Sequence, residues 1–177
     1  MRLFIALPLD DPARAAVSAY QDGLRALGLR GSFTRLENLH LTLAFLGEQP
    51  GPEQAVEAME AVSFSGPLTF LLNRPGRLSQ PDGPLLWLAP EQDGALKRLA
   101  KLVDSQLRMR GFELEERPFQ AHLTFCRRVK NPELLPRLPE ASVPVRAEGF
   151  TLYHSHMENG LLTYTPLYTQ PFGRKEA

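Results

Sequence analysis

One tripeptide pattern occurs twice in the chain, and its residue types are those of acid–base chemistry. His40 and Thr42 flank a leucine, and His122 and Thr124 flank a second leucine in the same order. An imidazole titrates near neutral pH, so one ring can accept a proton while the other donates one. Threonine hydroxyls donate hydrogen bonds to tetrahedral oxyanions such as phosphate. The set therefore suits in-line attack on a phosphodiester, in which the entering water loses a proton and the leaving oxygen gains one.

Both pairs fall in runs that the sequence predicts to be strands, at residues 38–46 and 120–127. Side chains alternate across a strand, so each histidine shares a face with its threonine while the leucines point the other way. We expect the apolar faces to enter the core and the polar faces to meet in one space. A single histidine in a strand is more often structural, and it is the repetition of the pattern that favours a functional pair.

The two tripeptides belong to an internal repeat. A shift of 82 positions places residues 3–8 on residues 85–90 and Asp11 on Asp93, and it superposes the two histidine-containing tripeptides without a gap. A strand, a helix start and a second strand thus recur at one offset. The repeat predicts an α+β fold in which two similar β-α-β lobes of mostly antiparallel sheet pack about a pseudo-twofold axis, with the active site in the cleft between them.

We treat residues 1–177 as one domain with a first lobe at about 1–80 and a second at about 81–177, and the last hairpin is allowed to cross between them. Short strands alternate with helices, separated by turn residues. The predicted elements besides the two strands above are helices at 11–27, 53–62 and 93–109, strands at 2–8, 68–72 and 85–88, a turn-rich loop at 73–83, and a hairpin of 143–157 and 161–168 with its turn at 158–160.

Composition limits the classes of function. The chain has 20 Lys and Arg against 20 Asp and Glu, so its net charge is zero; proteins that bind long nucleic acids usually carry a basic excess. We therefore expect nucleic-acid contact to be local, at an end or over a few nucleotides. The apolar run 3–9 is too short for a membrane helix and lacks a cleavage-site pattern, which predicts a cytoplasmic protein without membrane contact.

Other reactive side chains have plainer explanations. Cys126 is the only cysteine, which excludes an intramolecular disulfide and zinc sites with several cysteines. We expect a small buried thiol there and not a nucleophile. His154 and His156 share a strand face, but no acidic or cysteine partner lies at a supporting spacing, so we predict rim histidines and no metal site. Three arginines surround the first tripeptide and are either solvated or line the path of an RNA strand: Arg25, Arg30 and Arg35.

The chain resembles the two-histidine phosphoesterases, and within them the bacterial and archaeal RNA 2',3'-cyclic phosphodiesterases, also called 2'-5' RNA ligases. The similarity spans nearly the whole chain. The residues that carry it are 2–7, 38–43, 45–47 and 122–127, with Ser155 and Tyr164 in the last hairpin. Cys126 stands where the family more often has alanine, and Phe33 stands where many members have tryptophan.

The resemblance implies hydrolysis of a 2',3'-cyclic phosphate to a 2'-phosphate end without metal or cofactor, and reversible 2'-5' joining of RNA ends without ATP. By position, His40 would be the general acid that protonates the departing 3' oxygen, and His122 the base that activates water. Thr42 and Thr124 would hold the nonbridging phosphate oxygens, and Arg127 would add a positive charge beside them. The pseudo-symmetry leaves the order of the two histidines open.

The implied partner is RNA, either an end or a short oligonucleotide that carries a 2',3'-cyclic phosphate, and a monomer is expected. Three alternatives remain. One is a phosphodiesterase for small nucleotides such as ADP-ribose 1'',2''-cyclic phosphate. Another is a noncatalytic protein that binds RNA ends, which the presence of both histidines and both threonines argues against. The third is an acyl-transfer hydrolase using Ser155, which no nucleophile-elbow sequence supports.

Overall fold

The fold is known from a computed structural model, which describes residues 1–174. Helices and strands are interleaved along these residues, as predicted for an α+β chain. The helices are α1 (Asp11–Ala26), α2 (Glu53–Glu60) and α3 (Gly94–Met109), with short 3-10 helices η1 (Leu36–Asn38) and η2 (Pro132–Arg137). The strands are β1 (Arg2–Pro8), β2 (Ser32–Phe33), β3 (His40–Glu48), β4 (Ser65–Gly66), β5 (Leu68–Leu78), β6 (Leu85–Pro90), β7 (Leu123–Arg127), β8 (Val143–Ala147), β9 (Gly149–Glu158), β10 (Leu161–Pro171) and β11 (Gly173–Arg174).

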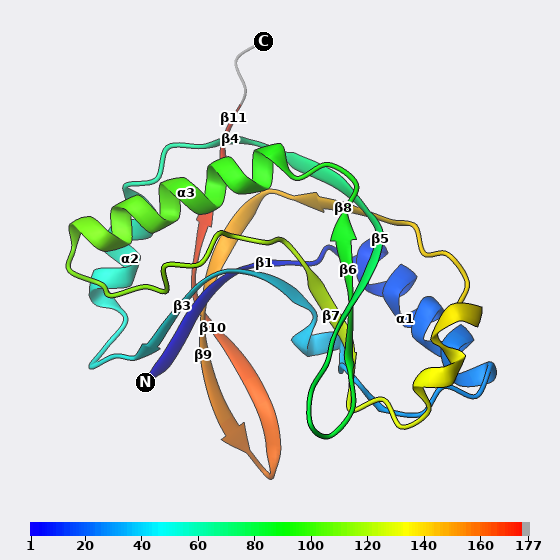
Figure 1. The fold of residues 1–177 in the computed structure, drawn as a ribbon. Helices are drawn as coiled ribbons and strands as arrows, with labels where there is room; N and C mark the ends of the chain where they lie inside the picture. Colours follow the sequence, from blue (N-terminus) through cyan, green and yellow to red (C-terminus); the bar gives the residue numbers. More distant parts are fainter. Residues whose placement is uncertain (175–177) are drawn as a thin grey trace.

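Two antiparallel sheets form the body of the molecule (Figure 1). Sheet A has the strand order β10-β9-β1-β3, and sheet B has the order β2-β7-β6-β5-β8. Neighbouring strands within each sheet run antiparallel, and the short pair β4 and β11 is parallel. The predicted fold class, with mostly antiparallel sheets, is therefore confirmed.

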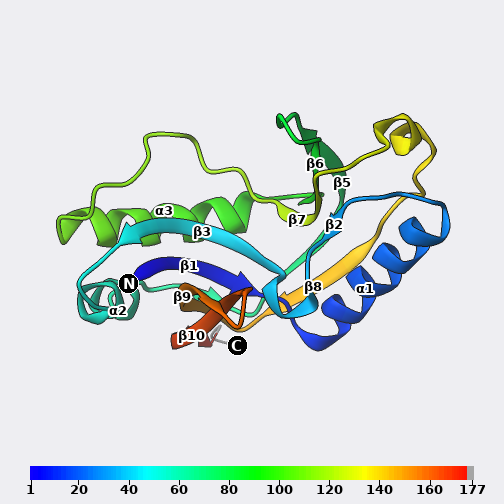
Figure 2. The same ribbon diagram turned by 90° about the horizontal axis from the view of Figure 1, so that it is seen from below.

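The internal repeat appears as two units of the same order, β1-α1-β3 and β6-α3-β7. Both helices start after an aspartate at the N-cap position, Asp10 for α1 and Asp93 for α3. Each helix packs on the sheet of the other unit, since α1 contacts β8 of sheet B and α3 contacts β3 of sheet A. Figures 1 and 2 show the two helices on opposite sides of the molecule. The exchange joins the two units into one body.

One continuous apolar core lies between the sheets and helices. Every second residue of β1 is buried on its core side, and α3 buries one face at helical spacing. Burying a leucine-sized side chain contributes about 1.5–3 kcal/mol, so this shared core ties α3 firmly to sheet A. The core residues of these two elements are Leu3, Ile5 and Leu7 in β1 and Leu96, Leu99, Val103 and Leu107 in α3.

The strand predicted at 120–127 begins only at Leu123, so His122 lies just before it. Two other predicted elements differ more in extent. The predicted loop includes residues 73–78 because they contain asparagine, proline and glycine, yet they continue β5, and residues 74–78 pair with β6. Residues 143–157 were expected as one strand, but the chain breaks at Glu148. The part before the break, β8, joins sheet B, and the part after it, β9, joins sheet A. In both places long-range pairing overrides the local pattern.

The turn of the last hairpin agrees with its prediction. Asn159 and Gly160 have positive φ angles of 52° and 78°, which suits the tight turn whose twist matches that of two antiparallel strands. Strands β9 and β10 extend from sheet A as a projecting ribbon in Figure 1. Each sheet contains strands from before and after residue 80, because β5 lies in sheet B and this hairpin lies in sheet A. The division into two lobes at about residue 80 rests on the sequence repeat alone and stays a prediction.

A glycine at the crossing between the sheets gives a stability test. A Cβ on Gly149 would lie 2.6 Å from the carbonyl oxygen of Gln170. Gly149→Ala should therefore lower the free energy of unfolding by about 1–3 kcal/mol. Gly23→Ala, inside α1 with open space around the added Cβ, should raise it by about 0.5–1 kcal/mol. Urea denaturation measures both, and wild-type stability of Gly149→Ala would contradict this close approach.

Candidate active site

Strand β3 places the first histidine and threonine on the face of sheet A opposite the core. In the β1–β3 ladder, His40 lies across from Pro8 and Thr42 lies across from Ala6. Leu41 between them is fully buried. The predicted alternation is thus confirmed for this tripeptide. His122 directly precedes β7, and the following Leu123 is fully buried while Thr124 is half-buried, so the second tripeptide shows the same alternation.

The two imidazoles are held in the same way. Nδ1 of His40 lies 2.7 Å from the carbonyl oxygen of Asn38, and Nδ1 of His122 lies 2.8 Å from the carbonyl oxygen of Gln120. A carbonyl only accepts, so Nδ1 is the donor in each neutral ring. Nε2 is therefore the atom of each ring that is free to exchange a proton.

Aromatic rings surround His40. The ring of Phe4 is 4.9 Å from the imidazole, and the ring of Tyr164 is 5.1 Å from it in an edge-to-face arrangement. Tyr164 comes from β10, where it pairs with Ser155 of β9. The last hairpin therefore completes the wall around the first histidine. Sequence reasoning marked Tyr164 and Ser155 only through the family resemblance.

The charges of two predicted site residues, His122 and Arg127, act on His40. Burial lowers the pKa of His40 below its usual 6.5, the hydrogen bond to the Asn38 carbonyl raises it, and the positive charges of Arg127 and His122 lower it further. The charge of Arg127 also lowers the pKa of Tyr164, against the stronger raising effect of burial. His122 and Arg127 thus lie close enough to His40 for their charges to act on it. In the free protein at neutral pH, His40 is a neutral imidazole.

A groove of about 760 Å³ reaches the site and has Thr42 and His122 among its lining residues. Its walls are β3, one face of α3 and the segment 114–120. Charges of both signs line it, many of them in exposed ion pairs such as Arg108–Asp104 and Arg117–Glu115. Of the two histidines, His122 lines the groove, and on β3 its lining runs from Thr42 to Phe45.

A bulge in β3 exposes an aromatic ring in this groove. Strict alternation from His40 would place Phe45 on the core side with Leu41. The β1–β3 register shifts between Ile5 and Ala6, so Phe45 pairs instead with Phe4 on the side of the histidine. Its side chain is 68% exposed and lines the groove. β-Bulges next to active sites commonly turn a side chain to the other face of the sheet. No pattern in the sequence predicts the bulge in β3.

The remaining candidates lie apart from this chemistry. His154 and His156 stack at 4.7 Å, and Nε2 of His156 is 2.7 Å from the Thr165 hydroxyl. Within residues 1–174, no three or more His, Cys, Asp or Glu side chains gather closely enough to hold a metal. Cys126 is buried, and burial raises the pKa of its thiol to about 11. The prediction of a buried thiol is confirmed.

The three arginines near the first tripeptide have different surroundings. The guanidinium of Arg25 lies 4.3 Å from the centre of the Phe33 ring, a favourable cation–π distance. Arg35 donates a hydrogen bond to the carbonyl oxygen of Leu162 in β10 and lies 3.6 Å from the Glu37 carboxylate. Arg30 is exposed, and its backbone N–H donates to the Asn131 side chain. Arg25 and Arg35 therefore have structural contacts.

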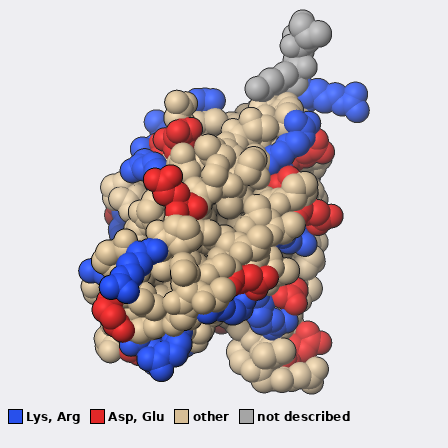
Figure 3. All heavy atoms as spheres, turned by 90° about the vertical axis from the view of Figure 1, so that its right-hand side faces the viewer, with Lys and Arg blue, Asp and Glu red and all other residues tan. Residues whose placement is uncertain are grey.

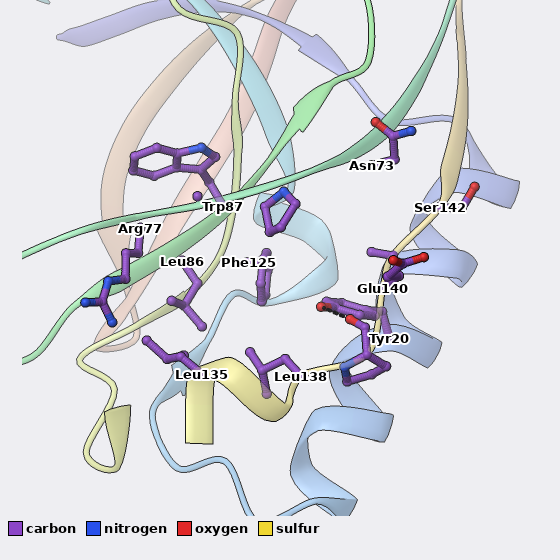
Figure 4. A pocket seen from close by; sticks show the side chains of 14 residues that line it. Tyr20, Asn73, Arg77, Leu86, Trp87, Phe125, Leu135, Leu138, Glu140 and Ser142 are labelled. Atoms are coloured by element: carbon purple, nitrogen blue, oxygen red, sulfur yellow. Dashed lines mark hydrogen bonds between the residues drawn. The ribbon is translucent and has the colours of Figure 1, made fainter. Parts of the chain in front are cut away.

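A second hollow has neither histidine of the pair among its lining residues. It measures about 880 Å³ and lies between α1, sheet B and the segment 135–142 (Figure 4). Trp87 at its edge links it to the site, because the indole is 5.6 Å from the His122 ring. Since proton-transfer groups are what the chemistry needs, the groove lined by Thr42 and His122 is the candidate site.

The surface fits the balanced composition. In Figure 3, Lys and Arg side chains are interspersed with Asp and Glu over the face that it shows. Within residues 1–174, none of the helices combines the length and apolar character needed to cross a membrane.

Comparison with known proteins decides the family. The model of the 2'-5' RNA ligase superfamily matches residues 9–157. The chain belongs to this superfamily. It is 33% identical to an RNA 2',3'-cyclic phosphodiesterase of Geobacillus stearothermophilus over 185 residues, which cover 97% of this chain and 59% of that relative's length. It is 36% identical to an RNA 2',3'-cyclic phosphodiesterase of Archaeoglobus fulgidus over 140 residues, covering 76% of this chain and 77% of the relative.

The fold has solved counterparts in the superfamily. Escherichia coli LigT in complex with 3'-AMP superposes with a TM-score of 0.77 at 27% identity, over 97% of this chain and 96% of that one. The family membership expected from the paired tripeptides is thereby confirmed, and so is the two-sheet architecture.

The electrostatic coupling in the site is testable without any substrate. Arg127→Met removes one of the positive charges that lower the pKa of His40. The pKa of His40 should rise but stay below 6.5, because burial is the larger cause and persists. A pH titration of the histidine ring signals by NMR measures the shift. The control Arg137→Met, at an exposed arginine of η2, should leave the pKa of His40 unchanged. An unchanged pKa of His40 in Arg127→Met would show that the charge of Arg127 does not act on this histidine.

Proposed function

We propose that this chain hydrolyses RNA 2',3'-cyclic phosphate ends to 2'-phosphate ends, with His40 and His122 as the acid–base pair. The observation that carries the proposal is that Thr42 and His122 line one groove, with each imidazole held through Nδ1. The charges of His122 and Arg127 also act on His40. The names of the relatives from Geobacillus stearothermophilus and Archaeoglobus fulgidus support the same substrate. A soluble, cytoplasmic monomer acting on RNA ends or short oligonucleotides remains part of this proposal.

The proposed step is a single in-line displacement. Water attacks the phosphorus, its proton passes to Nε2 of His122, and the bond between phosphorus and the 3' oxygen breaks. Nε2 of His40 donates a proton to that oxygen, so the phosphate stays on the 2' oxygen. With the 5' hydroxyl of a second RNA in place of water, the same displacement forms a 2'-5' linkage, and its reverse breaks that linkage.

The other site residues stabilise the charge of the phosphate. The hydroxyls of Thr42 and Thr124 are proposed to donate hydrogen bonds to the nonbridging oxygens, and the guanidinium of Arg127 to add a positive charge. His40 is neutral in the free protein because its pKa is lowered. A bound phosphate brings the negative charge that favours the imidazolium, so His40 is expected to gain its proton together with the substrate.

The groove supports an oligonucleotide over a free nucleotide as substrate. It continues from Thr42 and His122 past the exposed ring of Phe45. Nucleobases stack on exposed aromatic rings regardless of sequence. The nucleotides that precede the cyclic phosphate therefore have a surface to follow, which a small cyclic nucleotide would leave unused.

The roles of the two histidines can be separated with a sulfur substrate. A 3' sulfur in place of the 3' oxygen leaves as a thiolate without needing a proton, because thiol pKa values are about 8.5. On the oxygen substrate, His40→Ala and His122→Ala should each lose on the order of 10²–10⁴-fold in kcat. On the sulfur substrate, His40→Ala should regain most of its activity, while His122→Ala should stay impaired.

His154→Ala is the matched control for this experiment, since His154 is another half-buried histidine of sheet A outside the proposed pair. It should hydrolyse both substrates at the wild-type rate. Rescue of His122→Ala instead of His40→Ala would exchange the acid and the base. Near-normal kcat in either alanine variant on the oxygen substrate would rule out the pair.

We further propose that the reaction needs no metal or cofactor, because imidazoles perform both proton transfers and the threonines and Arg127 stabilise the charge. An oligonucleotide with a 2',3'-cyclic phosphate should be cleaved at an unchanged rate in EDTA, and all product should carry a 2'-phosphate. Chromatography and phosphorus NMR of the product, compared with synthetic oligonucleotides that end in a 2'-phosphate or a 3'-phosphate, identify the end. Activity lost on chelation and restored by zinc or manganese, or a 3'-phosphate product, would refute this mechanism.

A further inference from the structure

The segment between β2 and β3 touches both halves of the site. Strand β2 ends at Phe33, but Thr34 continues its hydrogen bonding along β7. The Thr34 N–H donates to the carbonyl oxygen of Phe125 at 3.0 Å, and its hydroxyl donates to the carbonyl oxygen of Thr124 at 3.1 Å. Thr34 is therefore bonded directly to the backbone of the second tripeptide.

Gln21 of α1 closes this arrangement from behind. It is only 3% exposed, one of the few buried polar side chains within residues 1–174. Its Nε2 donates to the carbonyl oxygens of Thr34 and Phe125, both at 3.0 Å. A buried amide with good partners fixes the groups that it joins, because breaking its bonds would leave the buried Gln21 N–H groups without an acceptor. Gln21 thus clamps the segment against β7.

The other end of the segment holds the first histidine. The Asn38 carbonyl accepts the hydrogen bond from Nδ1 of His40, and the Asn38 side chain donates to the Leu162 carbonyl in β10 at 3.1 Å. Arg35 also donates to the Leu162 carbonyl, at 3.4 Å. Residues 34–38 therefore form a strap, bonded to sheet B at Thr34 and to sheet A at Asn38.

We propose that Gln21 and Thr34 are positioning residues, which set the placement of His40 relative to His122 and Thr124 through this strap. Neither residue is proposed to touch the substrate, and each acts through the backbone of β7. The effect on rate rests on the proposed function, whereas the placement of the two rings does not. A misplacement of about 1 Å in a catalytic group costs on the order of 100-fold in rate, so a modest loosening of the strap has a measurable effect.

Thr34→Val tests the proposal, because it keeps the shape of the side chain and removes the hydroxyl bonded to the Thr124 carbonyl. We expect kcat to fall on the order of ten-fold, a fraction of the loss for a misplacement of about 1 Å, with KM little changed. Thr34→Ser restores the hydroxyl and should recover the wild-type kcat. Gln21→Met should act in the same direction, and circular dichroism and thermal melting establish that each variant is folded.

Tyr20→Phe is the matched control. Tyr20 precedes Gln21 in α1 and is labelled in Figure 4. Its hydroxyl donates to the Pro139 carbonyl at 3.0 Å, which lies in the segment after η2 and not in the strap. This variant keeps the ring that packs edge-to-face on Phe125 at 5.5 Å. Its kcat should equal that of the wild type, which separates the strap from a general weakening of α1.

A readout without substrate keeps the two proposals distinguishable. The positive charges of His122 and Arg127 lower the pKa of His40 at their present distance. In Thr34→Val, the pKa of His40 measured by NMR should move towards 6.5. In Thr34→Ser and Tyr20→Phe, it should stay at the wild-type value. If the pKa of His40 shifts in Thr34→Val but the wild-type protein has no phosphodiesterase activity, the strap is supported and the proposed function is overturned. Wild-type kcat and wild-type His40 titration in folded Thr34→Val would overturn the strap.

Discussion

The exchange of helices between the two units is the constraint on which the site depends. Each sheet has an apolar face that must be covered, and α1 covers sheet B while α3 covers sheet A. Neither unit can bury its own sheet with its own helix, so the units are obliged to assemble around one another. The groove lined by Thr42 and His122 lies where the two units meet. The proposed site thus takes one histidine and one threonine from each unit.

Rigidity in the site comes from backbone carbonyls and not from side-chain pairs. Asn38 and Gln120 offer their carbonyls to the two imidazoles from two residues upstream. Any residue type could supply such a carbonyl, so what fixes the rings is the path of the chain just before each strand. For His40 this path includes η1, whose own position depends on bonds to β7 and β10. Orientation of the two imidazoles is therefore a property of the tertiary fold.

The sequence predicted those features of the fold and the site that follow from side-chain alternation along strands and from the internal repeat. Alternation along a strand identifies His40 and Thr42 as neighbours, and the repeat pairs them with His122 and Thr124. The residues that it missed depend on pairing between distant segments. Phe45 turns towards the groove only because β3 is bulged against β1. Residues 74–78 continue β5 despite their proline and glycine because β6 offers partners. Side-chain period alone contains no information on such registers.

The position of β1 in sheet A has a consequence for how the protein is made. Its neighbours are β3, which follows within forty residues, and β9, in which Arg2 lies opposite Ser155. Ribosomes release the chain from its N-terminus onwards, so β1 keeps one unpaired edge until almost nine-tenths of the chain has been synthesised. The ring of Tyr164 reaches His40 later still. The wall around His40 is thus closed by β10, which is translated after every other strand of sheet A. Both histidines are therefore synthesised before the strand that completes the surroundings of His40.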